Sequence, residues 1–180
     1  MVVISILKYH FRKGQTVTKI RLETSKGNIV LELDEAKAPV TAANFLRYVD
    51  EGFYDGTIFH RVIASFMIQG GGFTKDMVQK KTHAEIVNES SNGLQNKRGA
   101  IAMARTSAPN SASSQFFINV VDNSFLDKAN AQDRVGYCVF GKVVEGLDVL
   151  DLIKVVKTSN SKGHGDVPLE PVVITKAVRV

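Results

Sequence analysis

The sequence predicts a mainly β fold in which short antiparallel strands form a sandwich or a barrel. Short segments that alternate apolar and polar residues recur from residue 20 to the C-terminal end. Only two segments have the spacing of an amphipathic helix. Strands and helices do not alternate regularly, as they would in a doubly wound sheet. Short strands spread over the whole chain are typical of antiparallel sandwiches and barrels.

Two strands open the predicted fold, and a helix follows them. Apolar residues alternate over 20–24 and again over 29–33. Gly27 lies in the turn between these segments and supplies the positive φ that a tight hairpin needs. The helix is expected between Pro39, which suits a first helical turn, and Gly52, which suits the far end.

The rest of the chain is again rich in strands. Strands are expected over 57–63 and 66–70, with Gly71 ending the second. The polar segment 75–98 is expected to be a long surface loop. The remaining strands are predicted at 99–104, 115–121, 135–144 and 172–180, and a second helix at 147–153.

The positive charge of the chain is concentrated in its first 20 residues. The net charge of the 180 residues is +5, and the first 20 residues contribute four positive charges and no acid, so the other 160 carry +1. We expect an N-terminal extension over 1–18 and one domain over 19–180. Nucleic acid binding has weak support, because no aromatic residues are interleaved along a basic stripe, and no nucleic acid partner is expected.

The cysteine content and the apolar segments of the sequence indicate the cellular compartment of the protein. Cys138 is the only cysteine and is expected to be a small buried residue, so no disulfide can form within the chain. The apolar run 2–7 is too short for a signal-peptide core, and no run approaches the ~20 residues that cross a bilayer. We expect a cytoplasmic protein with no membrane partner.

One arginine and one glutamine lie in an otherwise apolar stretch. Because side chains alternate in a strand, Phe59, Arg61 and Ile63 are expected to share one side. Met67 and Gln69 are expected to share a side of the next strand. A buried arginine must either meet a carboxylate or line a cleft where a ligand completes its hydrogen bonds. The residues alone leave both alternatives open.

Several common motifs are missing. The four histidines lack the spacing of a metal site, and no serine lies in a G-x-S-x-G motif. No Lys-Ser or Lys-Thr pair follows Gly70–Gly72, so close backbone packing or a sharp turn explains these glycines better than phosphate binding. We expect no metal and no hydrolase site.

Five blocks of sequence occur in a recognisable order and spacing. They are Phe59-His60-Arg61-Val62-Ile63, Phe66-Met67-Ile68-Gln69-Gly70-Gly71, Met103-Ala104-Arg105, Ser114-Gln115-Phe116-Phe117-Ile118 and Val139-Phe140-Gly141-Lys142-Val143. Together they resemble the signature blocks of the cyclophilin family of peptidyl-prolyl cis-trans isomerases. The segments 103–106 and 136–140 are similar to the short bacterial cytosolic type. The resemblance extends over about 19–180.

This resemblance implies a closed eight-stranded antiparallel barrel capped by two helices, with the active groove on the outside of the barrel wall. It implies that Arg61 is the catalytic arginine and that Gln69 lies near it in the groove. The residues implied to bind the substrate are Phe66, Met67, Phe117 and Leu126 in a proline pocket, and Ala104, Arg105 (through its backbone), Gln115, Phe125 and Tyr137 around it.

The chain departs from well-known eukaryotic members of the family at two positions. Phe125 stands where many of them carry tryptophan, and Tyr137 where they carry histidine. Tyr137 keeps a flat wall with a polar tip. Without an indole N–H at the rim of the groove, we expect binding of cyclosporin to be weak.

The implied function is isomerisation of Xaa-Pro bonds in unfolded or exposed segments of client proteins, by a monomer and without cofactor or metal. The main alternative is a module or chaperone that binds proline-containing peptides and in which turnover is incidental. A pure binder would tolerate loss of Arg61. Nucleic acid binding through residues 1–19 is a third possibility, and it would depend steeply on salt.

Overall fold

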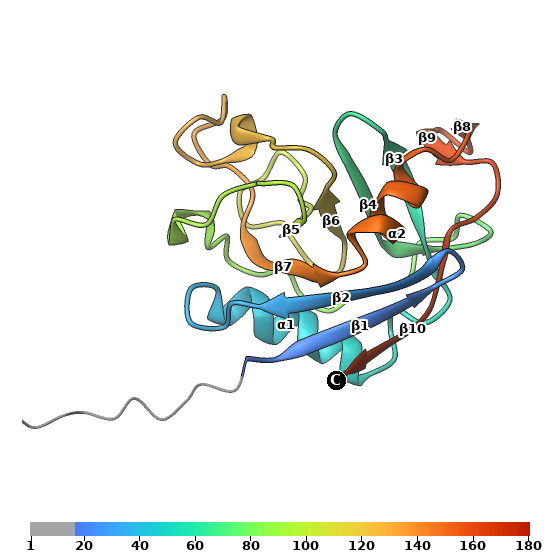
Figure 1. Cartoon of the computed structure of the whole chain (residues 1–180). Helices are drawn as coiled ribbons and strands as arrows, with labels where there is room; N and C mark the ends of the chain where they lie inside the picture. Colours follow the sequence, from blue (N-terminus) through green and yellow to red (C-terminus); the bar gives the residue numbers. More distant parts are fainter. Residues whose placement is uncertain (1–16) are drawn as a thin grey trace, which may run out of the picture.

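The computed structural model describes residues 17–180, which form a closed barrel of eight antiparallel strands (Figure 1). Their order around the barrel is β1-β10-β3-β4-β6-β5-β7-β2. The bounds are β1 Lys19–Thr24, β2 Gly27–Leu33, β3 Thr57–Ile63, β4 Met67–Thr74, β5 Ala100–Met103, β6 Phe116–Asn119, β7 Val139–Glu145 and β10 Val173–Arg179. The predicted barrel is confirmed. Of the expected extension, only residues 17 and 18 are described, so its boundary stays a prediction.

The interior of the barrel is filled by alternate residues of the strands. Phe116 is fully buried at its centre, and its ring lies 5.5 Å from that of Phe45, 5.4 Å from Tyr54 and 6.1 Å from Phe59. Because side chains alternate along a strand, Phe117, the next residue, faces the outside of the barrel. The barrel wall therefore has a packed inner face and an outer face free for other uses.

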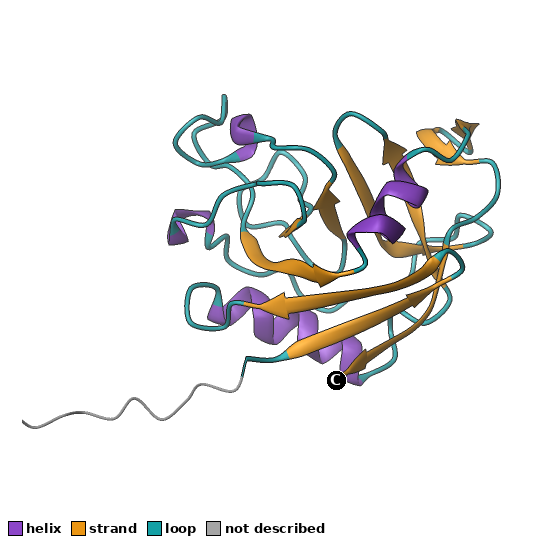
Figure 2. Ribbon diagram, viewed as in Figure 1, coloured by secondary structure: helices purple, strands orange, loops and turns teal. Residues whose placement is uncertain are grey.

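Two helices complete this core. Helix α1 (Pro39–Asp50) and helix α2 (Leu147–Lys154) confirm both predicted helices. Figure 2 shows α1 below β2 and α2 above β7, so the helices lie apart on the barrel. Each contributes its apolar stripe to the interior cluster. Within residues 17–180, no helix is both long and apolar enough to cross a membrane.

The first turn of α1 is capped from a distance. Its N-cap residue, Ala38, offers no side-chain hydrogen bond. The carboxylate of Glu89 instead accepts from the backbone N–H of Val40 at 3.2 Å and of Thr41 at 2.8 Å. A carboxylate at this end satisfies unpaired N–H groups and complements the helix dipole. The long loop over 75–98 is thereby tied to the helix.

Strand β4 is longer than predicted. It was expected to end at Gly70 but continues through the glycines to Thr74. The backbone of Gly71 has a φ of 80°, and the pairing with β3 shifts register between Thr57 and Phe59. The glycines therefore form an irregular stretch within a continuous strand.

Two further segments differ from prediction. Strand β7 begins at Val139 rather than at residue 135, because the preceding residues belong to a loop held by side chains. Strands β8 (Thr158–Ser161) and β9 (His164–Pro168) form a small separate sheet that was not predicted. Their residues are polar and lack the alternation of a half-buried strand. β9 contacts β3, which carries Arg61.

Candidate active site

A row of side chains crosses the outer face of the barrel over five strands. Arg61 on β3 lies opposite Gln69 on β4, and Gln69 lies opposite Phe117 on β6. Phe117 lies opposite Ala102 on β5, which lies opposite Val139 on β7. Residues directly opposite each other in antiparallel strands share one face. The outer surface thus changes from cationic to apolar along a single row.

A β-bulge at His60 turns Arg61 onto this surface. The register between β3 and β4 shifts between Phe59 and Arg61, which leaves His60 as the extra residue. Phe59 is fully buried in the interior, whereas Arg61 is partly exposed and Ile63 packs on the outer face. The prediction that these three share one side is wrong for Phe59, because a bulge interrupts the alternation.

The guanidinium of Arg61 is accessible. Its side chain is 43% exposed, and its one ion-pair partner within residues 17–180 is Asp166 on β9, with Nε 3.9 Å from Oδ2. An exposed pair at this distance contributes little. Of the two alternatives for this arginine, the geometry favours the cleft, because the guanidinium retains N–H groups for a ligand.

Gln69 is oriented by a second glutamine. Its Nε2 donates to Oε1 of Gln115 at 3.0 Å, so one of its two amide N–H groups is engaged within the barrel wall. Gln69 lies directly opposite Arg61 in the pairing of β3 with β4, so its carbonyl oxygen could accept from the guanidinium. Gly72 leaves the space for this arrangement, since a Cβ there would lie 2.6 Å from Cγ of Gln115.

An apolar surface adjoins these polar groups. We call it the proline seat and define it as Phe66, Met67, Phe117, Leu126 and Tyr137. The edge of the Phe117 ring meets Tyr137 with centroids 5.7 Å apart. Met67 lies on the same outer face as Gln69, as predicted. The sequence-predicted residues of the pocket are therefore gathered on one side of the barrel wall.

Phe125 stands at the rim of the seat. Its side chain is 56% exposed, and its ring stacks on Phe66 with centroids 5.6 Å apart. It precedes Leu126 in a short 3₁₀ helix, η2 (Ser124–Leu126). Phe125 thus extends the apolar wall outward, where a bulky ligand would meet it.

The comparisons with known proteins agree with this architecture. Residues 19–179 match the family described as cyclophilin type peptidyl-prolyl cis-trans isomerase. The chain belongs to the cyclophilin family. It is 59% identical over 162 residues to peptidyl-prolyl cis-trans isomerase cyp18 of Streptomyces antibioticus, with 89% of this chain and 98% of that protein covered. It is 56% identical to peptidyl-prolyl cis-trans isomerase B of Escherichia coli, with 86% and 95% covered.

Solved structures are similar as well. A cyclophilin type isomerase of Cryptosporidium parvum has a TM-score of 0.78 at 27% identity, covering 91% of this cyclophilin and 98% of that chain. A structure of the same protein in the presence of the dipeptide Ala-Pro has a TM-score of 0.73 at 27% identity, with 89% and 97% covered. The barrel is thus shared well beyond the range of high sequence identity.

Buried amides fix the turn that carries Phe66 in this cyclophilin. Asn123 is 2% exposed, and its Nδ2 donates to the carbonyl of Phe66 at 2.8 Å and to Oδ1 of Asn119 at 2.7 Å. Asn119 in turn donates to Oδ1 of Asn96 at 3.2 Å. These asparagines were not singled out from the sequence, because no motif marks an amide that acts through a backbone carbonyl.

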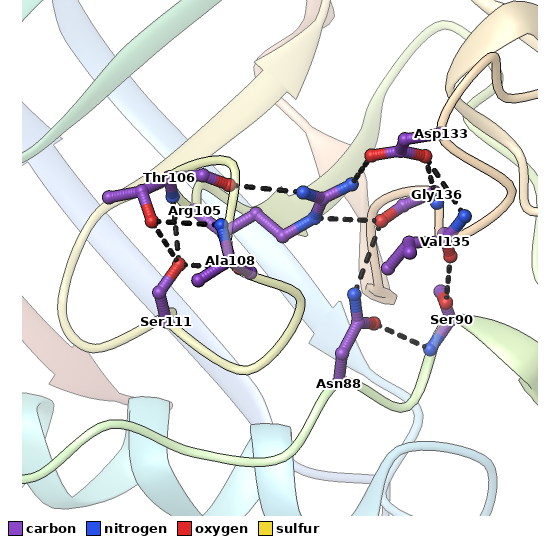
Figure 3. A network of polar contacts seen from close by, with 9 residues as sticks. All are labelled: Asn88, Ser90, Arg105, Thr106, Ala108, Ser111, Asp133, Val135 and Gly136. Atoms are coloured by element: carbon purple, nitrogen blue, oxygen red, sulfur yellow. Dashed lines mark hydrogen bonds and ion pairs between the residues drawn. The ribbon is translucent and has the colours of Figure 1, made fainter.

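The segment after β5 is paired to the start of β6 and carries Arg105. The backbone N–H of Ala104 donates to the carbonyl of Gln115 at 3.0 Å. The side chain of Arg105 is only 3% exposed and turns away toward Asp133 and Gly136 (Figure 3). The guanidinium of Arg105 is therefore engaged away from the seat, and the expected use of its backbone by a substrate stays a prediction. Asp133 was not singled out from the sequence.

Within residues 17–180, no group of three or more His, Cys, Asp and Glu side chains is arranged to hold a metal ion.

Cys138 is buried, and burial raises the pKa of its thiol. Its hydroxyl neighbour, Thr41, lies 3.4 Å from the sulfur. The predicted role of Cys138 as a small buried residue is confirmed.

The bulge holds a buried, uncharged histidine next to Arg61. His60 is 4% exposed, and its Nδ1 has no hydrogen-bond partner among the described residues. Burial, followed by the charges of His164 and Arg61, lowers the pKa of His60 from 6.5 to about 4. Asp166 is the nearby carboxylate, and it pairs with Arg61. Protonation of His60 therefore opposes the folded state.

This histidine should make stability fall in mild acid. In the unfolded chain His60 binds a proton below pH 6.5, whereas in the folded protein it stays neutral down to about pH 4. The free energy of unfolding should therefore decrease by up to about 3 kcal/mol between these pH values. Urea unfolding across this range tests it. The His60→Phe variant should lose most of this decrease, and an identical pH profile in the variant would refute the assignment.

Proposed function

We propose that this cyclophilin accelerates cis-trans rotation of Xaa-Pro bonds in unfolded or exposed segments of client proteins. The proline ring would occupy the proline seat, and Arg61 would act on the rotating bond. The observation that carries the proposal is the accessible guanidinium of Arg61 beside an apolar surface on the barrel wall. Neither a satisfied ion pair nor a core arginine would have this geometry.

The reaction needs no covalent step. Rotation breaks amide resonance and has a barrier of ~20 kcal/mol, although the cis and trans forms differ by only about 1 kcal/mol. In the twisted state the prolyl nitrogen becomes pyramidal and gains a lone pair that the planar amide lacks. A donor aimed at this nitrogen binds the transition state more tightly than the ground state. Because no bond is made or cleaved, rotation requires no cofactor or metal.

Arg61 suits this role because its guanidinium stays protonated at any accessible pH. Gln69 is proposed to orient it through the carbonyl oxygen, since one of its amide N–H groups donates to Gln115 and fixes the side chain. The oxygen can accept only from a donor, and Arg61 is the residue directly opposite. Gln69 would thus act as a groove residue that aims the arginine, and its second amide N–H could donate to the peptide.

The proline seat would hold the ring while the acyl side of the bond rotates. The residues of the seat, with Phe125 at its rim, offer apolar atoms and exclude water that would solvate the planar amide. Removing this solvation also favours the twisted form. The flanking peptide would run along the backbone of Ala104 and Arg105, with Gln115 beside it and the Tyr137 wall of the seat at its start.

A proline-peptide binding module is the rival function. The Cryptosporidium parvum structure obtained in the presence of Ala-Pro supports a proline-containing partner but does not separate binding from turnover. The presence of Arg61 favours the enzyme. In the planar ground state the prolyl nitrogen has no lone pair to accept a hydrogen bond, so a protein that only binds the peptide would gain nothing from a donor directed at it.

Exchange spectroscopy by NMR with an Ala-Pro peptide separates the two functions. The enzyme should produce exchange cross-peaks between cis and trans signals at catalytic concentrations, whereas a binder should only broaden or shift them. Absence of accelerated exchange would refute the isomerase. The predicted cytoplasmic location and monomeric state are separate questions, which cell fractionation and sedimentation can answer.

Cyclosporin should bind weakly because the rim lacks an indole donor. Phe125 offers a ring but no hydrogen bond at this exposed position. The Phe125→Trp variant should bind cyclosporin about 3- to 10-fold more tightly, as expected for one neutral hydrogen bond. Isothermal titration calorimetry measures the change, and Phe125→Leu serves as the control that adds no donor. Equal affinities of wild type and Phe125→Trp would contradict the explanation.

A further inference from the structure

Two walls of the proline seat stand at the ends of one loop. Leu126 and Tyr137 flank the segment 127–136, and the backbone N–H of Tyr137 donates to the carbonyl of Leu126 at 3.0 Å. The loop is therefore closed at its base, directly at the seat. Whatever fixes the position of 127–136 also fixes both walls.

The side chain of Arg105 holds this loop from the neighbouring segment after β5. Its Nε donates to the carbonyl of Gly136 at 3.0 Å, and its Nη2 pairs with the carboxylate of Asp133 (Figure 3). Nη1 donates to the carbonyl of Thr106 at 3.0 Å. All three nitrogens of the guanidinium are thus engaged, which leaves this arginine poorly placed to donate to a substrate.

The same guanidinium covers Tyr137. Its central carbon lies 4.4 Å from the centroid of the Tyr137 ring. The ring is also met by Phe117 at an interplanar angle of 78°. A planar cation on a ring face and an aromatic ring near the perpendicular restrict its rotation. Tyr137 is therefore oriented by a residue that does not itself face the seat.

Asp133 joins the guanidinium to the backbone of the loop. Its Oδ1 accepts from the N–H of Val135 at 2.9 Å and of Gly136 at 3.1 Å. The Arg105 partner and these N–H groups lower the pKa of Asp133 to about 2. The carboxylate is thus charged at every pH at which isomerase activity is measured.

The loop has little room to shift. Gly136 has a φ of 71°, and a Cβ there would lie 2.6 Å from the backbone nitrogen of Lys128. From the other side, Nδ2 of Asn88 donates to the carbonyl of Gly136 at 3.2 Å, and Oγ of Ser90 donates to that of Val135 at 2.5 Å (Figure 3).

We propose that Arg105 and Asp133 form a clamp that positions Tyr137 and Leu126 as walls of the proline seat. Both are positioning residues, because they act through the loop and the Tyr137 ring and not on the reacting atoms. The inference rests on the proposed function and deepens it. The two arginines thus have different roles. Arg61 is available to donate to the substrate, whereas Arg105 holds the loop.

Steady-state kinetics on an Ala-Pro peptide tests the clamp. The Asp133→Asn variant keeps an acceptor for the loop N–H groups but removes the charge, and Arg105→Lys keeps the charge but loses the planar fork. Each should lower kcat/KM by about 10-fold, within the range for small misplacements of binding groups. The loss should appear mainly in KM, because the seat holds the ring. The Asp50→Asn variant, which breaks the remote ion pair with Arg179, is the matched control and should retain wild-type kcat/KM.

A double-mutant cycle with Tyr137→Ala separates positioning from general destabilisation. Because the clamp acts partly through the ring, Asp133→Asn should have a clearly smaller effect on kcat/KM in the Tyr137→Ala background than in wild type. Unchanged kcat/KM in both single variants would overturn the proposal, and so would fully additive effects in the cycle. The melting temperature of each variant confirms that the assay samples folded protein.

Failure of the clamp and failure of the proposed function give different results. If wild type catalyses exchange and the clamp variants equal it, only the clamp is refuted. If wild type does not catalyse exchange, the aromatic NMR signals of Tyr137 still test the clamp. They should shift in Asp133→Asn and not in Asp50→Asn, and unchanged signals would refute it.

Discussion

Replacing Arg61 with alanine should lower kcat/KM for an Ala-Pro peptide by about 10- to 100-fold. A hydrogen bond from a charged donor contributes about 1.5–3 kcal/mol, and each tenfold change in rate corresponds to about 1.4 kcal/mol. The donor acts on a lone pair that exists only in the twisted state. The loss should therefore appear equally in kcat and in kcat/KM, with little change in KM.

Two variants sharpen this test. Arg61→Lys keeps the charge but places a single ammonium where a planar fork stood, so it should recover only part of the lost activity. Arg47→Ala removes an arginine of α1 that pairs with Glu51 on the surface, and it should leave the kinetics unchanged. An Arg61→Ala enzyme as fast as wild type would refute the role of Arg61 but not the isomerase activity itself.

The parts of the fold that follow local patterns could be predicted from the sequence. Strand β3 was predicted with its observed bounds, because Thr57–Ile63 has the length of a strand and is rich in β-branched and aromatic residues. Helix α1 was predicted from the spacing of its apolar residues and from Pro39 at its first turn. The proline seat was predicted through the family resemblance, since each residue alone looks like ordinary core.

The features that the sequence did not reveal depend on contacts between distant residues. Because of the bulge at His60, Phe59 and Arg61 lie on opposite faces of the barrel wall. No sequence pattern in this segment marks the bulge. Asp133 lies 28 residues from Arg105 along the chain, so only the folded barrel brings the two together. Strand β9 was missed for a different reason, because it and its local partner β8 are mostly polar and lack the alternation of a half-buried strand.

The glycines of β4 are explained by contacts with residues far away in the sequence. The sequence alone disfavoured a phosphate-binding loop but did not distinguish a turn from close packing as the reason for them. A turn or a phosphate-binding loop would tolerate alanine at one or more of these positions. In the barrel, a Cβ on Gly71 would lie 2.8 Å from the Phe116 ring and 2.9 Å from that of Tyr54. Both rings are fully buried at the centre of the interior cluster, so neither can move aside without displacing others.

Gly71→Ala should therefore destabilise the protein by about 3 kcal/mol. An alanine with a φ near 80° costs about 1–2 kcal/mol, and overpacking a dense core adds about 1–3 kcal/mol. Gly93→Ala is a matched control, because its φ is 79° and a Cβ there meets nothing within 4 Å. It should cost only about 1 kcal/mol, the backbone contribution alone. Urea unfolding of both variants measures the difference. Equal losses would mean that the rings of Phe116 and Tyr54 yield readily, and that backbone conformation alone requires glycine at this position behind the proline seat.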